Sequence, residues 1–368
     1  MSKEEGFPLV EVSGTPFERG LQHGRAVPER VKGSVALYRD QLARRGVDVA
    51  TTNLLAWDVV PKIRAFDETY FEEMRGMAEG AGVSIEDIIL VNCRTEMMYG
   101  HAALGAAREA LDDGCTGLVV LPGAARAGRL MHAHNWDWRE ACADTGIVLK
   151  VKKNGDGPDM LMFTEAGTLG RHGFNSDGLS LSGNFLTCDR DYQGAADVPL
   201  GLLRRKMLEC RNMTAAMRML FATRRFCSNN LMLAHAGGEA VDLECAPDEI
   251  FWLTPEDDIL VHANHWVSAP ARAKLVDLGL QNTPDSIYRQ RRVTAALMAK
   301  RSDIGWDVVK AALADEFGKP EGVLTYPAPA SHDSVYCTVA TTLMDPGAGV
   351  MWVARKPYES REFVEYRL

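Results

Sequence analysis

Residues 111–120 have the sequence LDDGCTGLVV, and both the fold and the chemistry of the chain depend on how this stretch is interpreted. The Asp113-Gly114 pair tolerates positive φ, so one interpretation is a tight turn that leads Cys115 into a strand. The other is that the peptide bond between Gly114 and Cys115 is meant to be cut. The rest of the sequence has to decide between the two.

The chain before this stretch has the pattern of helices. Residues 15–45 predict a helix, and Thr15 and Pro16 suit its N-cap and first turn. A second helical block is predicted over 69–100. Within it, the SIED motif at 84–87 has the form of a capping box that opens another short helix.

After Cys115 the pattern changes to short apolar runs separated by turn residues. Together with helical patterns at 199–223 and 286–315, these runs predict an α+β layered body with many antiparallel strands. The Ala-rich residues 101–111 suit a helix or a linker, so we expect the boundary between the two parts near 101–114. The predicted strands lie within 115–123, 129–138, 146–167, 178–186, 230–247, 251–266 and 338–357.

The overall composition is that of a folded soluble protein, with 46% hydrophobic and 25% charged residues in a chain of 368. The formal net charge of −9 disfavours nonspecific binding to nucleic acid or to an anionic membrane, because both normally need a basic face. The N-terminus does not resemble a secretory signal, and no apolar run approaches the roughly 20 residues of a membrane-spanning helix. We therefore expect a cytoplasmic protein.

Eight cysteines are scattered along the chain without a C-x-x-C pair, which indicates free, mostly buried thiols in a reducing compartment. They are Cys93, Cys115, Cys142, Cys188, Cys210, Cys227, Cys245 and Cys337. Any one of them is more often a packing residue than a chemical one.

Cys115 differs because of what a cut before it would create. A thiol attacks as thiolate, and its reference pKa of about 8.5 means that it needs a base nearby. Cleavage after Gly114 would give Cys115 a free α-amine, whose reference pKa of about 7.7–8.0 suits it to accept the thiol proton. Gly114 has no side chain to obstruct the scissile carbonyl.

Three further residues are candidates for the same chemistry. In HNWDW (134–138), alternation along a strand would place Asn135 and Asp137 on one face, where the carboxylate could hold the new ammonium or orient the thiol. Asn184 and Asn264 carry amides that could donate to a developing oxyanion. The alternative is structural: a carboxylate that ends a strand, and amides bonded to backbone groups.

Two pairs of histidines raise the question of a metal. His132 and His134 would share one strand face, and His262 and His265 flank Asn264. Neither pair has a carboxylate or cysteine at metal-motif spacing, so we expect no metal. The glycine pairs match neither a phosphate-binding loop nor a dinucleotide fingerprint, so no cofactor is expected either.

DGCT at 113–116 followed by NWDW at 135–138 resembles the autoproteolytic isopenicillin-N (acyl-coenzyme A:6-aminopenicillanic acid) acyltransferase family, within the N-terminal-nucleophile hydrolases and more distantly related to bile-salt hydrolases. Further blocks in the family's order are GTPFERGLQHG (14–24), EEMRGMAEGA (72–81), NCRTEMMYG (92–100), TEAGTLGRHGFNSDGL (164–179) and VHANH (261–265).

The resemblance implies a four-layer αββα sandwich and a self-cleaved chain. It implies that Gly114 precedes the cut and that Cys115 becomes the N-terminal nucleophile. Asp137 matches the aspartate that contacts the nucleophile, Asn264 matches an asparagine lining the site, and Asn184 matches the asparagine of the oxyanion hole in the bile-salt hydrolases.

One departure concerns a catalytic arginine that the family places in a stretch aligned with 332–342. No arginine occurs there, and Val335 occupies the likeliest match. A lost guanidinium would alter substrate charge preference or slow the chemistry. Arg94, Arg289 and Arg292 are candidates to replace it.

We therefore expect a helical segment 1–114 and a nucleophile-bearing body 115–368 that form one globular unit. The expected reaction is hydrolysis of a small linear amide through a thioester on Cys115. Acyl transfer to an amine such as 6-aminopenicillanic acid is the first alternative, and an uncleaved, catalytically silent binding protein is the second. The expected partners are a small-molecule amide or acyl donor, the chain's own cleaved fragment and a second copy in a homo-oligomer.

Overall fold

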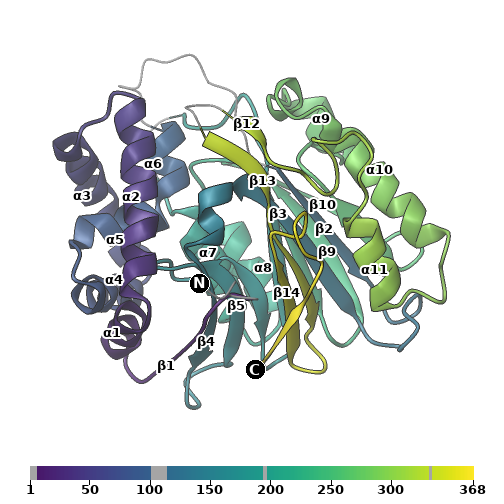
Figure 1. The fold of residues 1–368 in the computed structure, drawn as a ribbon, viewed down its shortest axis with the longest axis horizontal. Coiled ribbons are helices and arrows are strands. Elements are labelled where there is room, and N and C mark those ends of the chain that lie inside the picture. The colour runs from purple at the N-terminus through teal and green to yellow at the C-terminus, as the bar shows by residue number, and fades with distance from the viewer. Residues whose placement is uncertain (1–5, 101–113, 194–196, 331–333) are drawn as a thin grey trace.

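Two β-sheets lie face to face at the centre of the molecule, and helices cover the outer face of each (Figure 1). The computed structural model describes residues 6–100, 114–193, 197–330 and 334–368. The four layers confirm the predicted αββα sandwich. The Asp113 half of the predicted turn and the linker 101–111 lie outside the described residues.

The first sheet has eight strands, all antiparallel except for the pair β1–β4. In order across the sheet they are β1 (Leu9–Ser13), β4 (Gly146–Lys152), β5 (Met160–Glu165), β6 (His172–Asn175), β7 (Leu179–Phe185), β8 (Asn229–His235), β9 (Glu239–Cys245) and β10 (Ile250–Leu253). β1 shows that the N-terminal segment is not purely helical, because it adds an edge strand to this sheet.

The second sheet carries Cys115. Its strands in order are β11 (Ile259–His262), β2 (Gly114–Val120), β3 (Met131–Arg139), β13 (Ser334–Asp345), β14 (Val350–Arg355) and β15 (Val364–Arg367), with β12 (Ala328–Ala330) paired to β13. β2 therefore lies between β11 and β3, with a hydrogen-bonded strand on each side.

The outer layers are helical. The first sheet is covered by α1 (Pro16–Ala26), α2 (Pro28–Arg44), α3 (Val49–Phe66), α4 (Glu68–Ala81), α5 (Ile85–Asn92), α6 (Arg94–Gly100), α7 (Leu200–Leu208) and α8 (Met213–Ala222). The second is covered by α10 (Asp285–Met298) and α11 (Trp306–Leu313), and the short helix α9 (Ala269–Lys274) packs near Phe251 of β10. Short 3₁₀ turns lie at Glu140–Ala143 and Gly279–Gln281.

Local signals placed several helix ends correctly. Thr15 caps α1 with Pro16 in its first turn, and Ser84 and Asp87 form the predicted capping box of α5. The single helix predicted over 15–45 is wrong in one respect. The first helix ends at Ala26, with Val27 as its C-cap, and a second helix begins at Pro28. A proline lacks the N–H that a continuous helix would use, so it starts a helix readily but interrupts one.

The helices α1 and α4 pack with their backbones unusually close. Each has two glycines spaced one turn apart, Gly20 and Gly24 in α1 and Gly76 and Gly80 in α4. A Cβ added at Gly20 would overlap the carbonyl oxygen of Glu73, and one at Gly76 would overlap that of Phe17. The glycines thus allow the short distance between the backbones of the two helices.

A Gly76→Ala variant is expected to lose about 1–3 kcal/mol of unfolding free energy, because the new methyl group meets rigid backbone. Gly33→Ala is the matched control: it also lies inside a helix, and its methyl group meets only the Thr145 side chain, at 3.1 Å. Urea unfolding checks both. Equal unfolding free energies of the two variants would contradict the claim that Gly76 is needed for the close packing of α1 and α4.

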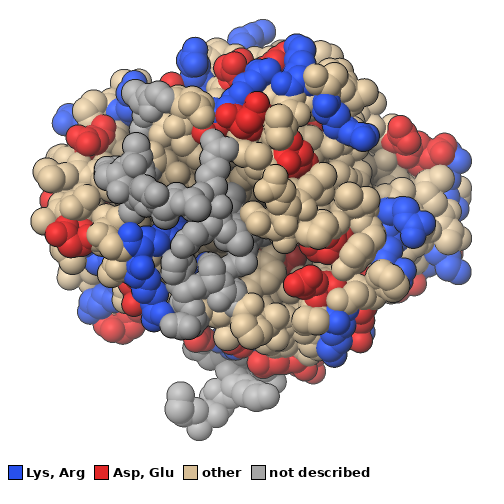
Figure 2. All heavy atoms as spheres, turned by 90° about the horizontal axis from the view of Figure 1, so that it is seen from above, with Lys and Arg blue, Asp and Glu red and all other residues tan. Residues whose placement is uncertain are grey.

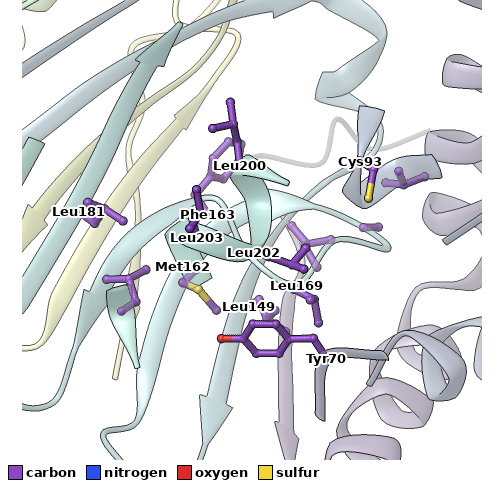
Figure 3. Close-up of a cluster of buried hydrophobic side chains, with 14 of the residues drawn as sticks. Tyr70, Cys93, Leu149, Met162, Phe163, Leu169, Leu181, Leu200, Leu202 and Leu203 are labelled. Atoms are coloured by element: carbon purple, nitrogen blue, oxygen red, sulfur yellow. The ribbon is translucent and has the colours of Figure 1, made fainter. Parts of the chain in front are cut away.

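An apolar core joins the helical layer to the first sheet (Figure 3). Tyr70 of α4 and Cys93 reach toward a cluster in which Phe163 of β5 and Leu202 and Leu203 of α7 are fully buried. Residues on both sides of position 114 thus share one core.

The surface carries charges of both signs. Acidic and basic side chains are interspersed over the face seen in Figure 2. Within the described residues, no helix is both long and apolar enough to cross a membrane.

Candidate active site

Cys115 is the second residue of β2 and is 1% exposed. It lies opposite Trp136 of β3, and Gly114 lies opposite Asp137. Opposite residues of an antiparallel pair point to the same side, so the thiol lies on the Trp136 face and Asp137 on the other. Asn135 shares the Asp137 face, as predicted, and donates to the carbonyl oxygens of Leu313 and Val323.

The backbone nitrogen of Cys115 has a side-chain partner. Its N–H donates to Oδ1 of Asn264 at 2.7 Å, and Nδ2 of Asn264 donates to the carbonyl oxygen of Phe185 at 3.0 Å. The amide of Asn264 therefore has a fixed orientation, with its oxygen facing the atom that would become the α-amine after a cut.

Arg289 of α10 holds the same residue from the other side. Its Nη1 donates to the carbonyl oxygen of Cys115 at 2.7 Å, and its Nη2 to Oδ1 of Asn264 at 3.0 Å. Burial works against the charge of this guanidinium, but the carboxylates of Asp285 and Asp137 hold the pKa of Arg289 above its usual value. A fixed cation thus lies at the Cys115 backbone.

Asp137 lies beside the expected cleavage point rather than beside the sulfur. Its Oδ1 accepts a hydrogen bond from Thr338 at 2.6 Å. A Cβ added at Gly114 would overlap the Tyr336 hydroxyl and come within 3.1 Å of Asp137 Oδ2. Of the two roles considered for the carboxylate, this position favours contact with the backbone at the cut over orientation of the thiol.

On the thiol side, a charged group near the sulfur is Arg171, which lies between β5 and β6. Its Nη2 is 4.0 Å from Sγ of Cys115, and its guanidinium lies over the Trp136 ring at 4.0 Å from the centroid. Arg171 also lines a cavity of about 60 Å³, together with Phe185 and residues of α6 and α7.

Asn184 lies in β7, near Gly117 of the nucleophile strand. Its Nδ2 donates to the carbonyl oxygens of His262 and Ala263, both at 2.9 Å. Both amide hydrogens are therefore engaged, and donation to a substrate oxyanion would require breaking one of these bonds.

The histidines of the two pairs bond to protein groups. His132 is hydrogen-bonded to Ser180 and Ser182, and His134 to Asn184. No group of three potential metal ligands occurs among the residues that the structure describes.

His262 supports the turn that carries Asn264. Its Nε2 lies 3.0 Å from Glu244 and 3.7 Å from Asp242. Burial opposes its charge, but these carboxylates outweigh that effect and raise the pKa of His262 to about 9. Glu244 also accepts from the backbone of Val267 and Ser268, which ties both ends of the turn to β9.

A curated protein is similar in sequence to most of the chain. The chain is 28% identical over 322 residues to the acyl-coenzyme A:6-aminopenicillanic-acid-acyltransferase 40 kDa form of Emericella nidulans, covering 83% of this chain and 80% of that protein. No protein-family model matches the chain. The similarity confirms the resemblance that the motifs predicted.

Solved structures give the fold. A variant of the conjugated bile acid hydrolase from Clostridium perfringens superposes with a TM-score of 0.50 at 14% identity, covering 69% of this chain and 92% of that one. The chain has the N-terminal-nucleophile hydrolase fold. The N-acylethanolamine-hydrolyzing acid amidase ortholog of Caenorhabditis elegans is also similar, with a TM-score of 0.46, 16% identity, and coverage of 69% of this chain and 100% of that one.

The structure shows where the three arginines considered as replacements lie. Val335, at the position aligned with the family arginine, is 38% exposed and pairs with Pro329 of β12. Among the three arginines considered as replacements, Arg289 is the one bonded to Cys115. Arg94 pairs with Glu165 and Arg292 with Asp315.

The sequence analysis named Arg289 only as one of three candidates, although the helix pattern around it carries a more specific signal. The buried residues of α10 are Ser286, Arg289, Val293 and Leu297, which recur at the spacing of one helix face. An arginine on an otherwise apolar stripe has to find an anion or carbonyl oxygens inside the protein. That reasoning points to Arg289 without an alignment.

Proposed function

We propose that the chain cuts its own Gly114–Cys115 bond and then hydrolyses a small linear amide through a thioester on Cys115. The main support is the environment of the Cys115 backbone nitrogen, which is buried and faces the Asn264 oxygen at 2.7 Å. Any buried amide N–H needs an acceptor, but this acceptor is an amide oxygen bonded in turn to the buried Arg289, an arrangement that would also fix the orientation of a free amine.

In the cut, the sulfur of Cys115 attacks the Gly114 carbonyl carbon and the C–N bond breaks. The thiol proton passes to the departing nitrogen. Water then hydrolyses the Gly114 thioester, leaving a carboxylate on Gly114 and both a free thiol and a free amine on Cys115. The absence of a side chain at Gly114 matters here, because the Tyr336 hydroxyl occupies that space.

In the amide reaction, the new amine takes the thiol proton and the sulfur attacks the substrate carbonyl. Collapse of the tetrahedral intermediate expels the substrate amine, which takes the proton back. Water then releases the acid from the thioester. Asn264 accepts a hydrogen bond from the amine and so directs its lone pair, and Arg289 keeps Asn264 and the Cys115 carbonyl in place.

The two fragments are expected to stay together. β1 pairs with β4, and Glu73 of α4 forms a fully buried ion pair with Arg205 of α7. Separation of the fragments would expose this ion pair and the core shared by the helical layer and the first sheet to water. Both exposures cost free energy, so the fragments are expected to stay bound.

Acyl transfer remains the second candidate, because the Emericella nidulans relative is named an acyltransferase. It uses the same thioester, with an amine in place of water. The catalytically silent alternative depended on the missing arginine at 332–342, and the bond from Arg289 to Cys115 favours the catalytic proposal over it.

Intact-mass and N-terminal analysis of the purified protein tests the proposal. We expect two pieces, 1–114 and 115–368, that co-elute in native buffer, the larger one beginning Cys-Thr-Gly. A panel of simple amides and acyl-thioesters, with and without an added amine, then separates hydrolysis from transfer. Active protein in which Gly114 is still joined to Cys115 would refute the mechanism.

A further inference from the structure

Arg171 is a buried cation for which the described part of the chain supplies no anionic partner. It is 8% exposed, and no carboxylate oxygen in the described part of the chain lies within 4.0 Å of its guanidinium. Its Nε has no hydrogen-bond partner in that part either. A guanidinium taken out of water with unsatisfied donors is costly, so a site that keeps one normally receives an anion.

The surroundings of Arg171 fix the direction from which that anion would come. Stacking on Trp136 covers one face of the guanidinium and leaves its N–H edge for binding. The indole N–H of Trp136, the residue opposite Cys115, is a second buried donor without a partner among the described residues. Two donors of this kind beside the sulfur suit a carboxylate.

The cavity that Arg171 lines has a surplus of positive charge. Its charged lining consists of three arginines and two glutamates, namely Arg94, Arg171, Arg204, Glu96 and Glu165. Burial raises the pKa of Glu96, which favours its neutral form. Arg94 is already paired with Glu165 at 3.3 Å, so the pair contributes little net charge.

We infer that Arg171 is a specificity-determining residue that binds a carboxylate placed next to the scissile amide, as in N-acyl-α-amino acids. The inference rests on the proposed role of Cys115 as nucleophile. Because Nη2 lies 4.0 Å from Sγ, the anion has to be within about three bonds of the carbon that the sulfur attacks. The α-carboxylate of a leaving amino acid meets this requirement.

Alkylation of Cys115 by iodoacetate and by iodoacetamide tests the inference without a known substrate. In both reactions the sulfur bonds to carbon, iodide leaves and the thiol proton goes to solvent or the amine. Only iodoacetate carries a carboxylate on the attacked carbon. The modification rate of Cys115 is followed by peptide mass spectrometry, which separates it from the other seven cysteines.

We expect the wild-type protein to prefer iodoacetate, and Arg171→Gln to lower the iodoacetate-to-iodoacetamide rate ratio by about tenfold, the effect of one charge-assisted hydrogen bond. Arg171→Lys is expected to keep part of the preference. Arg211→Gln, at an exposed arginine paired with Asp177, is the matched control and is expected to keep the wild-type ratio.

Other outcomes overturn the inference. If Arg171→Gln slows both reagents equally, Arg171 acts on the thiolate and not on a ligand anion. If wild-type Cys115 shows no preference for iodoacetate, Arg171 does not bind a carboxylate next to the attacked carbon; this decides the question even where the variants fail to fold. The state of the Gly114–Cys115 bond, read from the same spectra, reports separately on the proposed function.

Discussion

Cys115→Ala is expected to accumulate as one chain of 368 residues and to show amide hydrolysis at least about 1,000-fold below the processed enzyme. The substitution removes the atom that attacks the Gly114 carbonyl, and it also removes the nucleophile of the second reaction. Denaturing gels and intact mass follow the cut, and release of amine from the best amide of the panel follows the chemistry.

The substitution is not expected to disturb the fold. Cys115 is buried, but the backbone bonds that anchor it, from N–H to Asn264 and from Arg289 to its carbonyl oxygen, do not involve the side chain. Cys245→Ala removes another fully buried thiol and serves as the control, with cutting and activity near wild type. Cleavage of Cys115→Ala at the same bond would show that another group makes the cut.

The parts of the fold that sequence could predict depend on neighbours along the chain. Thr15 and Ser84 cap helices through bonds to residues three positions on, and such signals need no tertiary context. β1 was not predicted because Leu9–Ser13 becomes a strand only by pairing with β4, which is more than a hundred residues away. β6 and β15 have four residues each, too short for alternation to reveal.

The candidate site divides in the same way. Cys115 and Gly114 could be named from one motif because they adjoin the bond that matters. Arg289 reaches Cys115 from a helix 174 positions later in the chain, and only the packing of α10 on β2 shows that it does. For Asn184, the motif gave the residue type but not the two carbonyl oxygens that engage its amide.

Replacing Arg289 is expected to have the second largest effect. Arg289→Met leaves Asp285, Asp137 and the Cys115 carbonyl without their cation, so we expect a loss of about 3–5 kcal/mol of unfolding free energy. We also expect self-cleavage to slow by about 100-fold, the scale of losing one preorganised donor at a reacting carbonyl. Urea unfolding measures the first effect, and the appearance of the 115–368 fragment over time measures the second.

Two further variants separate the role at the site from the role in stability. Asp285→Asn weakens the ion pair within α10 but leaves the bonds from Arg289 to Cys115 and Asn264, so it should cost stability with little loss of cutting. Arg289→Lys keeps a positive charge but cannot bond the Cys115 carbonyl and Asn264 at the same time. We therefore expect its self-cleavage to be slowed more than its loss of unfolding free energy alone would explain. If cutting instead follows stability alone across all three variants, Arg289 is a core ion-pair residue, and the Cys115 backbone is held for structural reasons only.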